Sequence, residues 1–455
     1  MKLWNYLKEK MLNHPNQLVC EGNAEISFED LVVWVEAFSK RLDGLNSCAI
    51  LCQSEMAAAM SLLVCVAKGV TAIPLSIRYG EKHCSKIIET ISPEAIITDA
   101  NGKFEVLDIA ESKYQAPKEH PALIMCTSGT TGNPKGAMLS ESNIITNVTD
   151  IASYFAIEET DTILISRPLY HCAVLTGEFL TALVKGTKIR FYSEQFNPMK
   201  MLELIRDYKI TAFCGTPTLL GMMARLKKSI CTDTLKHICI SGECMGKEIG
   251  LRIADAFSHS DIYYVYGLTE ACPRVSYLPP HLFRKHPDCV GYPLKSVSLK
   301  LKNEHAQECA PNEDGFLWVK GGNIMMGYYN EPKKTEDILK DGWLFTGDIA
   351  TITDEGLLKI KGRCDDLIIK GGMNIYPVEI ESVMKLDIRT KDVLVYGIKT
   401  RYGTQIGMTI SGDYKSIEEV KRACMDYLPP FQVPAFISIV EELPKNGTGK
   451  IIRRK

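Results

Sequence analysis

The sequence has 455 residues, of which 45% are hydrophobic and 24% are charged, and its formal net charge is −2 at pH 7. A chain of this length usually folds into more than one domain, and its balanced charge excludes a general electrostatic attraction to nucleic acid. No apolar run is both long enough and sufficiently free of charge to span a bilayer, and the charged N-terminal segment lacks the pattern of a signal peptide. We therefore expect no membrane span and no nucleic-acid partner.

From the N-terminus to about residue 275 the chain alternates between strand-like and helix-like patterns. Residues 49–75 have the pattern of a strand, a helix and a second strand, and residues 95–99 that of a further strand. Short apolar segments continue at 121–127, 161–167, 187–192, 210–215, 237–242 and 261–267. Such alternation predicts a large α/β domain whose parallel sheets carry helices on both faces. Several segments lead directly into polar or glycine-rich motifs, and ligands of open α/β sheets bind beyond the carboxyl ends of the strands.

The pattern changes at about residue 290. Short strands and turns at 296–303, 315–321 and 356–362 predict a small β-rich subdomain over about 290–362. Residues 363–366 lack periodicity and indicate a linker, and the remaining residues have the helix and strand patterns of a small α+β unit. We therefore expect an N-terminal domain at 1–362, a hinge at 363–366 and a mobile C-terminal domain at 367–455.

Sixteen cysteines are dispersed along the chain, many of them within apolar runs, and no C-x-x-C pair occurs. Free cysteine behaves as a small core hydrophobe, and a protein without a secretory signal normally stays in a reducing compartment. The nine histidines are scattered as well, which disfavours a structural zinc site. We therefore expect free thiols and a cytoplasmic location.

The segment MCTSGTTGNPKG at 125–136 has the composition of a phosphate-binding loop. Its glycines allow the backbone to approach an anion closely, its hydroxyl and N–H groups can surround phosphate oxygens, and Lys135 adds a positive charge. The spacing differs from the G-x-x-x-x-G-K-[ST] loop, because Asn133 follows Gly132 and Gly136 follows Lys135. The dinucleotide motif G-x-G-x-x-G is absent from the segment, and an ordinary surface turn is the structural alternative.

Six further segments extend the pattern: PLYH (168–171), YGLTE (266–270), GFLWVKGGNIMMGYY (315–329), GWLFTGD (342–348), KGRCDDLIIKGGMNIYPVEIE (361–381) and LPKNGTGKIIR (443–453). In this order they resemble the adenylate-forming superfamily of acyl- and aryl-CoA synthetases, peptide-synthetase adenylation domains and luciferases, and most of all the acyl-CoA synthetases. The resemblance implies that ATP and Mg²⁺ activate a carboxylic acid to acyl-AMP with release of pyrophosphate. The acyl group then passes to the thiol of coenzyme A.

Two alternatives stay open at this point. An acyl or aryl carrier protein can present its phosphopantetheine as the acceptor, because that arm ends in the same thiol as coenzyme A. A non-catalytic relative that only binds acyl-adenylate is the other alternative, and the intact Glu270, Asp348 and Lys450 argue against it.

The resemblance also implies roles for particular residues. Lys450 would bridge the acid and the α-phosphate, Glu270 would hold magnesium together with Thr131, and His171 would gate the acid pocket. Glu270, His171 and Lys450 are thus the expected catalytic residues. The residues expected to bind ATP or AMP are Thr127, Ser128, Gly129, Thr130, Thr131, Gly132, Lys135, Ser241, Gly242, Glu243, Tyr266, Gly267, Thr269, Asp348 and Arg363.

Taken singly, most of these residues have an ordinary structural explanation. Lys450 lies among other terminal basic residues, Glu270 occupies the place of a helix-capping carboxylate, and Asp348 suits a turn. Tyr266 would stack on adenine or serve as a core aromatic, and Arg363 would bind the nucleotide or carry a linker charge. The order of the motifs favours function for all five.

The same resemblance assigns the acid pocket to His171, Cys172, Val174, Phe213, Cys214, Gly215 and Ala271. Relatives that activate amino acids carry a carboxylate just after the entrance motif, whereas this segment has no acidic residue before Glu178. A buried ammonium without a partner is costly, so we expect an acid with an uncharged tail, either aryl or short-to-medium aliphatic. Arg274 leaves open a second polar group on the acid; otherwise it is a surface arginine.

The small C-terminal domain would present Lys450 in the first half-reaction and another face in the second, which implies that this domain moves. The resemblance places the hinge at Asp365, and a hinge needs only a few residues that absorb changes in φ and ψ. We expect the C-terminal domain to rotate about Asp365 between acyl-AMP formation and thioester formation.

Overall fold

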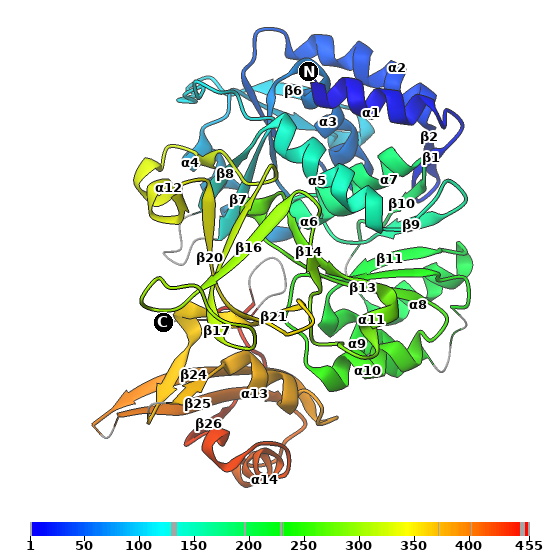
Figure 1. The fold of residues 1–455 in the computed structure, drawn as a ribbon. Coiled ribbons are helices and arrows are strands. Elements are labelled where there is room, and N and C mark those ends of the chain that lie inside the picture. The colour runs from blue at the N-terminus through cyan, green and yellow to red at the C-terminus, as the bar shows by residue number, and fades with distance from the viewer. Residues whose placement is uncertain are drawn as a thin grey trace.

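The computed structural model describes residues 2–128, 134–194, 197–227, 230, 232–371, 373–401, 403–445 and 451–453. Within these ranges a large N-terminal α/β part precedes a small C-terminal part, which confirms the expected fold class (Figure 1). The small part lies at the lower end of the view, coloured orange to red, below the yellow strands of the larger part.

The largest sheet contains nine strands: β1 (Leu18–Glu21), β2 (Ala24–Ser27), β9 (Thr162–Ile165), β10 (Lys188–Phe191), β11 (Ala212–Gly215), β12 (His237–Ile240), β13 (Asp261–Gly267), β14 (Arg274–Leu278) and β15 (Tyr292–Pro293). Their order is β15-β14-β13-β12-β11-β9-β10-β1-β2. The strands from β13 to β1 run parallel, whereas β14, β15 and β2 are antiparallel. The apolar segments expected as strands therefore become the parallel centre of this sheet.

A second sheet contains seven strands: β3 (Ser47–Ile50), β4 (Thr71–Pro74), β5 (Ala95–Thr98), β6 (Glu105–Asp108), β7 (Leu123–Ser128), β8 (Pro134–Leu139) and β18 (Gly327–Tyr328). Their order is β18-β8-β7-β4-β3-β5-β6. Strands β7 and β8 form an antiparallel hairpin around the expected phosphate loop. The centres of both sheets are parallel, as expected, and antiparallel strands are added toward their edges.

The helices are α1 (Lys2–Leu12), α2 (Phe28–Phe38), α3 (Glu55–Lys68), α4 (Glu81–Ile91), α5 (Glu141–Tyr154), α6 (Cys172–Val174), α7 (Thr181–Lys185), α8 (Pro198–Asp207), α9 (Pro217–Leu226), α10 (Lys247–Ala256), α11 (Pro280–Phe283), α12 (Pro332–Ile338), α13 (Pro377–Met384) and α14 (Ile417–Tyr427). Helix α3 is buried along nearly its whole length, so its sequence is apolar on every face. The Ser54 side chain accepts from the Ala57 N–H at its start, and Gly69 ends it in the left-handed conformation.

The β-rich subdomain is a five-stranded sheet of β16 (Val297–Lys302), β17 (Asp314–Gly321), β19 (Leu339–Lys340), β20 (Trp343–Ile352) and β21 (Leu358–Arg363). All its pairings are antiparallel. This sheet leads into the C-terminal part, which contains β22 (Ile368–Lys370), β23 (Met373–Ile375), β24 (Thr390–Thr400), β25 (Gly403–Gly412) and β26 (Phe436–Ile439).

The C-terminal part has a hydrophobic core of its own. The buried side chains of this core all come from residues 368–428, and helices α13 and α14 supply much of it. Two larger cores fill the N-terminal part, one against each face of the nine-stranded sheet. Every cysteine in the described ranges is a free thiol, and most are buried. None of the described helices has the length and apolar character needed to cross a membrane.

Candidate active site

The expected site residues gather where strands of the two large sheets end. Thr127 is the penultimate residue of β7 and lies opposite Lys135 of β8 in the hairpin. Gly129, Thr130, Thr131, Gly132 and Lys450 lie outside the described residues, and only the backbone of Ser128 is described. The remaining candidates are considered below in the groups that the structure forms.

Tyr266, Asp348 and Arg363 form one hydrogen-bonded group. Strands β20 and β21 place Asp348 directly opposite Arg363. The Arg363 Nη1 lies 3.2 Å from Asp348 Oδ1 and donates to the Thr346 carbonyl at 2.7 Å. From the end of β13, the Tyr266 hydroxyl donates to the other oxygen of Asp348. Three segments distant in sequence thus meet at one carboxylate that is only 8% exposed, so a simple turn aspartate does not describe Asp348.

Burial sets the electrostatics of this group. Burial raises the pKa of the Asp348 carboxyl, and the Arg363 guanidinium opposes that shift. Burial and the neighbouring Asp348 also raise the pKa of the Tyr266 hydroxyl, which keeps it a donor. A carboxylate held between a guanidinium and a phenol can accept hydrogen bonds from ligand hydroxyls that approach its exposed edge.

Glu270 and Lys135 meet at Tyr328, a residue to which the sequence assigned no role. Glu270 lies in a short 3₁₀ helix (Thr269–Ala271). Its Oε1 accepts from the Tyr328 hydroxyl at 2.6 Å. The Lys135 ammonium lies 5.2 Å from the centre of the same ring, within the range of a cation–π contact. Tyr328 therefore links the end of the phosphate loop to the acidic residue of the YGLTE motif.

The backbone of the YGLTE motif is tightly enclosed. A Cβ added at Gly267 would lie 1.8 Å from the Pro273 carbonyl oxygen, so only glycine fits there. Thr269 begins the 3₁₀ helix that carries Glu270, and the Glu270 carbonyl accepts from Met325 N at 2.9 Å. The turn segment before β18 thus holds the backbone of Glu270 in place.

The Ser241–Glu243 segment follows β12. Ser241 is buried, its N–H donates to the Gly215 carbonyl at 3.0 Å, and Gly242 adopts a φ of +93° that favours glycine. The Glu243 carboxylate accepts from the Thr218 hydroxyl at 2.6 Å, which turns it toward helix α9. The segment therefore forms a wall next to the end of β11.

His171 lies in an aromatic group at the start of α6. Its Nε2 is hydrogen-bonded to the Tyr79 hydroxyl, and the neighbouring Tyr170 hydroxyl is bonded to His83 Nε2 at 3.2 Å. Edge-to-face ring contacts join the four side chains. Burial raises the pKa of the Tyr79 hydroxyl, so it stays protonated beside the imidazole. Neither Tyr79 nor His83 belongs to a motif, so no sequence pattern pointed to them.

The structure brings together only part of the expected acid pocket. Cys172, Val174 and Cys214 are buried in one hydrophobic cluster, and the Thr176 hydroxyl ties the Cys172 and Cys272 carbonyls at 2.8 and 3.2 Å. Phe213 and Ala271 pack in the other cluster, and Gly215 ends β11. Because Phe213 and Cys214 are consecutive in a strand, they face opposite sides of the sheet. Phe213 and Cys214 therefore do not line the same space.

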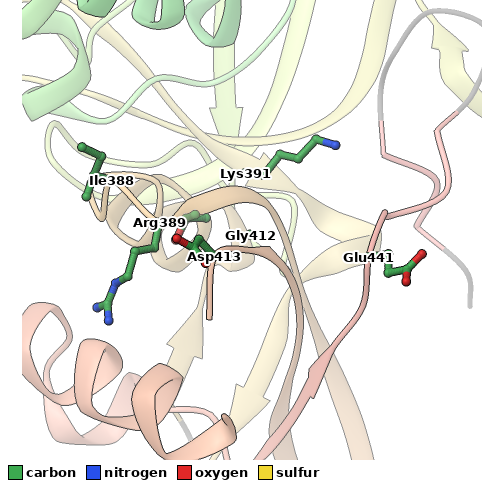
Figure 2. A pocket seen from close by; sticks show the side chains of 7 residues that line it. Ile388, Arg389, Lys391, Gly412, Asp413 and Glu441 are labelled. Carbon is green, nitrogen blue, oxygen red and sulfur yellow. The ribbon is translucent and has the colours of Figure 1, made fainter. Parts of the chain in front are cut away.

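A surface pocket also lies on the C-terminal part. Its lining consists of Ile388, Arg389, Thr390, Lys391, Gly412, Asp413 and Glu441. Figure 2 shows that these side chains point in different directions and do not converge on one point. No motif residue lines it, so the pocket offers no alternative active site.

The model of the family described as AMP-binding enzyme matches residues 7–329, which is more than half of the chain. The protein belongs to the AMP-binding enzyme family.

Other members of this family are similar over most of the chain. The protein is 30% identical to a long-chain-fatty-acid–CoA ligase of Haemophilus influenzae, over 81% of this chain and 68% of that protein. It is 26% identical to a 2-succinylbenzoate–CoA ligase of Bacillus licheniformis, over 99% of this chain and 98% of the relative. A solved structure of the o-succinylbenzoate CoA synthetase MenE from Bacillus subtilis, in complex with its acyl-adenylate intermediate, superposes with a TM-score of 0.85 at 26% identity and covers 98% of this chain and 96% of that one.

The same Bacillus subtilis synthetase has been solved with ATP and a magnesium ion. That structure has a TM-score of 0.84 and 25% identity, and the match covers 98% of both chains. The AMP-binding fold of this protein therefore extends through the C-terminal part, beyond the residues matched by the family model.

Proposed function

We propose that the protein is an acid–thiol ligase that forms acyl-AMP from a carboxylic acid and ATP, and then transfers the acyl group to coenzyme A. The observation that carries the proposal is the Tyr266–Asp348–Arg363 group, which lies beside Glu270 in a chain of the AMP-binding family. Relatives over most of its length are named acid–CoA ligases.

The chemistry needs positioning and charge neutralisation more than covalent catalysis by the protein. In the first step an oxygen of the carboxylate attacks the α-phosphorus, and pyrophosphate leaves. In the second step the thiol sulfur attacks the activated carbonyl carbon, AMP leaves with the bonding electrons, and the thiol loses its proton. Asp348 would accept the ribose hydroxyls, Tyr266 would cover the adenine, and Lys135 would attract the phosphates. Lys450 would neutralise charge between the acid and the α-phosphate.

Glu270 is suited to hold magnesium next to the phosphates. Only one of its oxygens is engaged by Tyr328, and Mg²⁺ prefers one or two carboxylates together with water and substrate phosphates. In the described part of the chain no group of three or more His, Cys, Asp or Glu side chains could form an all-protein metal site. A single carboxylate and ATP therefore fit the donor set, and the metal would neutralise phosphate charge.

We expect Glu270→Gln to raise the magnesium concentration needed for half-maximal acyl-AMP formation by roughly tenfold, the equivalent of about 1.4 kcal/mol. The substitution keeps the shape and removes the charge. Tyr328→Phe is the matched control, because it removes the hydrogen bond to Glu270 but keeps the carboxylate, so its magnesium titration should stay near that of the wild type. An unchanged titration for Glu270→Gln would leave Glu270 with a structural role.

A substitution at Gly347 tests whether the pairing of Asp348 with Arg363 contributes to ATP binding. Gly347 has a φ of +73°, and a Cβ there would lie 2.7 Å from Arg363 Nη2. We expect Gly347→Ala to displace the guanidinium and raise the KM for ATP roughly tenfold, or about 1.4 kcal/mol, on top of about 1–2 kcal/mol of left-handed strain. Gly356→Ala has the same strain at φ +77° with its nearest contact at 3.6 Å. If both variants lower thermal stability alike and neither changes the KM, the pairing has no part in ATP binding.

A two-part organisation supports the proposed rotation. We propose the boundaries 1–362, 363–366 and 367–455, because Cys364–Asp366 form a short 3₁₀ helix and a separate core begins at Ile368. Few polar contacts cross between the two parts. Tyr376 donates to Asp314 at 2.6 Å, and Arg225 donates to the Lys385 carbonyl at 3.1 Å.

The acid is an aryl or short-to-medium aliphatic carboxylic acid rather than an amino acid. Glu178, the first acidic residue after the entrance motif, is fully buried and its Oε1 lies 2.5 Å from Arg167 Nη2. Its charge is therefore already balanced by the Arg167 guanidinium, which disfavours its use for a substrate ammonium.

ATP–pyrophosphate exchange across benzoates, fatty acids and the twenty amino acids tests the first half-reaction. Thioester formation should then depend on coenzyme A, and a phosphopantetheinylated carrier protein supplied instead tests the other acceptor. Exchange with amino acids alone would contradict the proposed acid, and the absence of exchange with every acid would contradict the adenylation itself.

A further inference from the structure

Three charged side chains are buried beside the apolar part of the acid pocket. Arg167 follows β9, Glu178 lies in the π-helical turn Leu175–Leu180 that continues α6, and Arg274 begins β14. The Arg167 guanidinium also donates to the Ser241 hydroxyl at 3.3–3.4 Å. The group is therefore connected directly to the segment that follows β12 at the proposed nucleotide site.

Arg274 is the deepest of the three, with 1% of its surface exposed, so it is not the surface arginine considered from the sequence. Its backbone is fixed by the side chains of Asn147 and Asn323 at 2.9–3.2 Å. Its guanidinium lies against Gly177, where a Cβ would be 2.9 Å from Nη2. The turn therefore has a glycine where any side chain would push the guanidinium away.

The guanidinium of Arg274 has weak partners. Nη2 donates to the Cys239 sulfur at 3.6 Å, Nε has no hydrogen-bond partner, and within the described ranges no carboxylate forms an ion pair with it. Arg167 and Glu178 pair with each other, yet Arg167 Nε and Glu178 Oε2 also lack partners. Of the two buried guanidinium groups, only that of Arg167 thus has a carboxylate partner among the described residues.

The other titratable groups facing this cluster are the thiols of Cys214 and Cys239, which are register partners on β11 and β12, and the hydroxyl of Tyr154. Contact with Cys214 lowers the pKa of the Cys239 thiol, and Arg274 lowers it further. Burial raises the pKa of Tyr154 and keeps it neutral. Burial also raises the pKa of Glu178, against the effect of Arg167. Among these groups around Arg274 the only carboxylate is therefore that of Glu178, which already pairs with Arg167.

An unpaired guanidinium taken out of water is strongly destabilising, whereas a carboxylate that forms two parallel hydrogen bonds with it recovers much of that cost. An alkyl tail packed against Arg274 would recover none of this desolvation cost. The location of Arg274 relative to the proposed adenylation site matters as well. On β11, Cys214 directly precedes Gly215, and on β12, Cys239 lies two residues before Ser241. Gly215 and Ser241 border the proposed adenylation site. A short acid held with one end at that site would bring its other end near Arg274.

We propose that the substrate is an acid with a second anionic group, a dicarboxylate in the simplest case, and that Arg274 with Arg167 receives the distal carboxylate. This inference rests on the proposed acid activation and replaces the uncharged tail expected from the sequence. The distal carboxylate would form the hydrogen bonds to the Arg274 guanidinium that the Cys239 sulfur now accepts only weakly. The proximal carboxylate is the one activated.

Matched acids test the inference: hexanoate against adipate, octanoate against suberate, and benzoate against terephthalate and 2-succinylbenzoate. In ATP–pyrophosphate exchange we expect kcat/KM for the better dicarboxylates to exceed that of the matched monocarboxylate by about 10²-fold or more. Equal or better exchange with the monocarboxylates would overturn the inference while leaving acid activation intact, and Cys239 would then be the counter-ion of Arg274.

Variants of Arg274 supply the second measurement. Arg274→Met should lose the dicarboxylate preference, and Arg274→Lys, which keeps the charge and is the safer variant for folding, should retain part of it. Arg284→Met is the control, because Arg284 is an exposed arginine that pairs with Asp255 at 2.8 Å. A preference unchanged in both Arg274 variants would overturn the inference.

Direct binding separates this inference from the proposed function. If no acid supports exchange, calorimetric titration of wild type and Arg274→Lys with suberate and octanoate in the presence of ATP still decides it. Suberate binding that weakens in the variant would support the anion site although adenylation has failed, and no preference for suberate over octanoate would overturn it.

Discussion

Replacing Lys450 with alanine should lower acyl-AMP formation by about 10²–10³-fold or more, the effect of removing a preorganised charge at a developing transition state. Lys450 lies between Gly449 and Ile451 in the segment LPKNGTGKIIR, whose glycines let the chain approach a phosphate closely. Because the proposed role of the lysine is at the bond between the acid and the α-phosphate, thioester formation from supplied acyl-AMP should be spared. Pyrophosphate exchange and single-turnover thioester formation measure the two steps separately.

The residues on either side of this segment provide the control. Lys445 and Ile451 pair as an antiparallel bridge, and Arg453 lies 2.5 Å from Glu381. Lys445 itself pairs with Asp392 at 2.7 Å. Lys445→Ala removes a nearby lysine with a structural partner and should leave both half-reactions close to wild type. If Lys450→Ala impairs both half-reactions equally, the loss reflects misfolding or another role, and Lys450 is not specific to adenylation.

The elements of the fold could be predicted because each is set by local patterns. The apolar segments at 210–215 and 237–242 became β11 and β12, and the helix with Ser54 before it and Gly69 after it has its signals in the sequence. The antiparallel edges could not be predicted in this way. The pairing of β13 with β14 depends on how the chain turns after the YGLTE motif, and a strand pattern alone does not set its direction.

The candidate site was likewise only partly predictable from the sequence. Asp348 and Arg363 each belong to a recognisable motif, but their pairing across β20 and β21 is a property of the sheet. Tyr328 lies within a motif whose resemblance carried no role for the ring. The burial of Arg274 depends on Asn147, Gly177 and Cys239, which are far from it in sequence, so no local pattern distinguishes it from a surface arginine. The cytoplasmic location stays a prediction from the cysteine content.

Asp365→Pro should separate the two half-reactions in the opposite sense from Lys450→Ala. Proline fixes φ near −65°, a value that suits the 3₁₀ helix in which residue 365 lies, and so favours the described arrangement of the two parts over others. Arg363 precedes the change and stays paired with Asp348, so acyl-AMP formation should continue. In the proposed rotation, thioester formation uses the second arrangement and should fall by about 10²-fold, the size of a misplaced reacting group.

Asp365→Ala is the matched control, because it removes the same side chain but leaves φ free. We expect it to retain most of its turnover, which would assign the effect of proline to the backbone and not to the lost carboxylate. Among the described residues, the polar contacts that a rotation must break include Tyr376 with Asp314, Arg225 with Lys385, Lys385 with Thr218, and Lys361 with Glu379. If Asp365→Pro turns over like wild type, residue 365 is not the hinge and another residue of the linker absorbs the change.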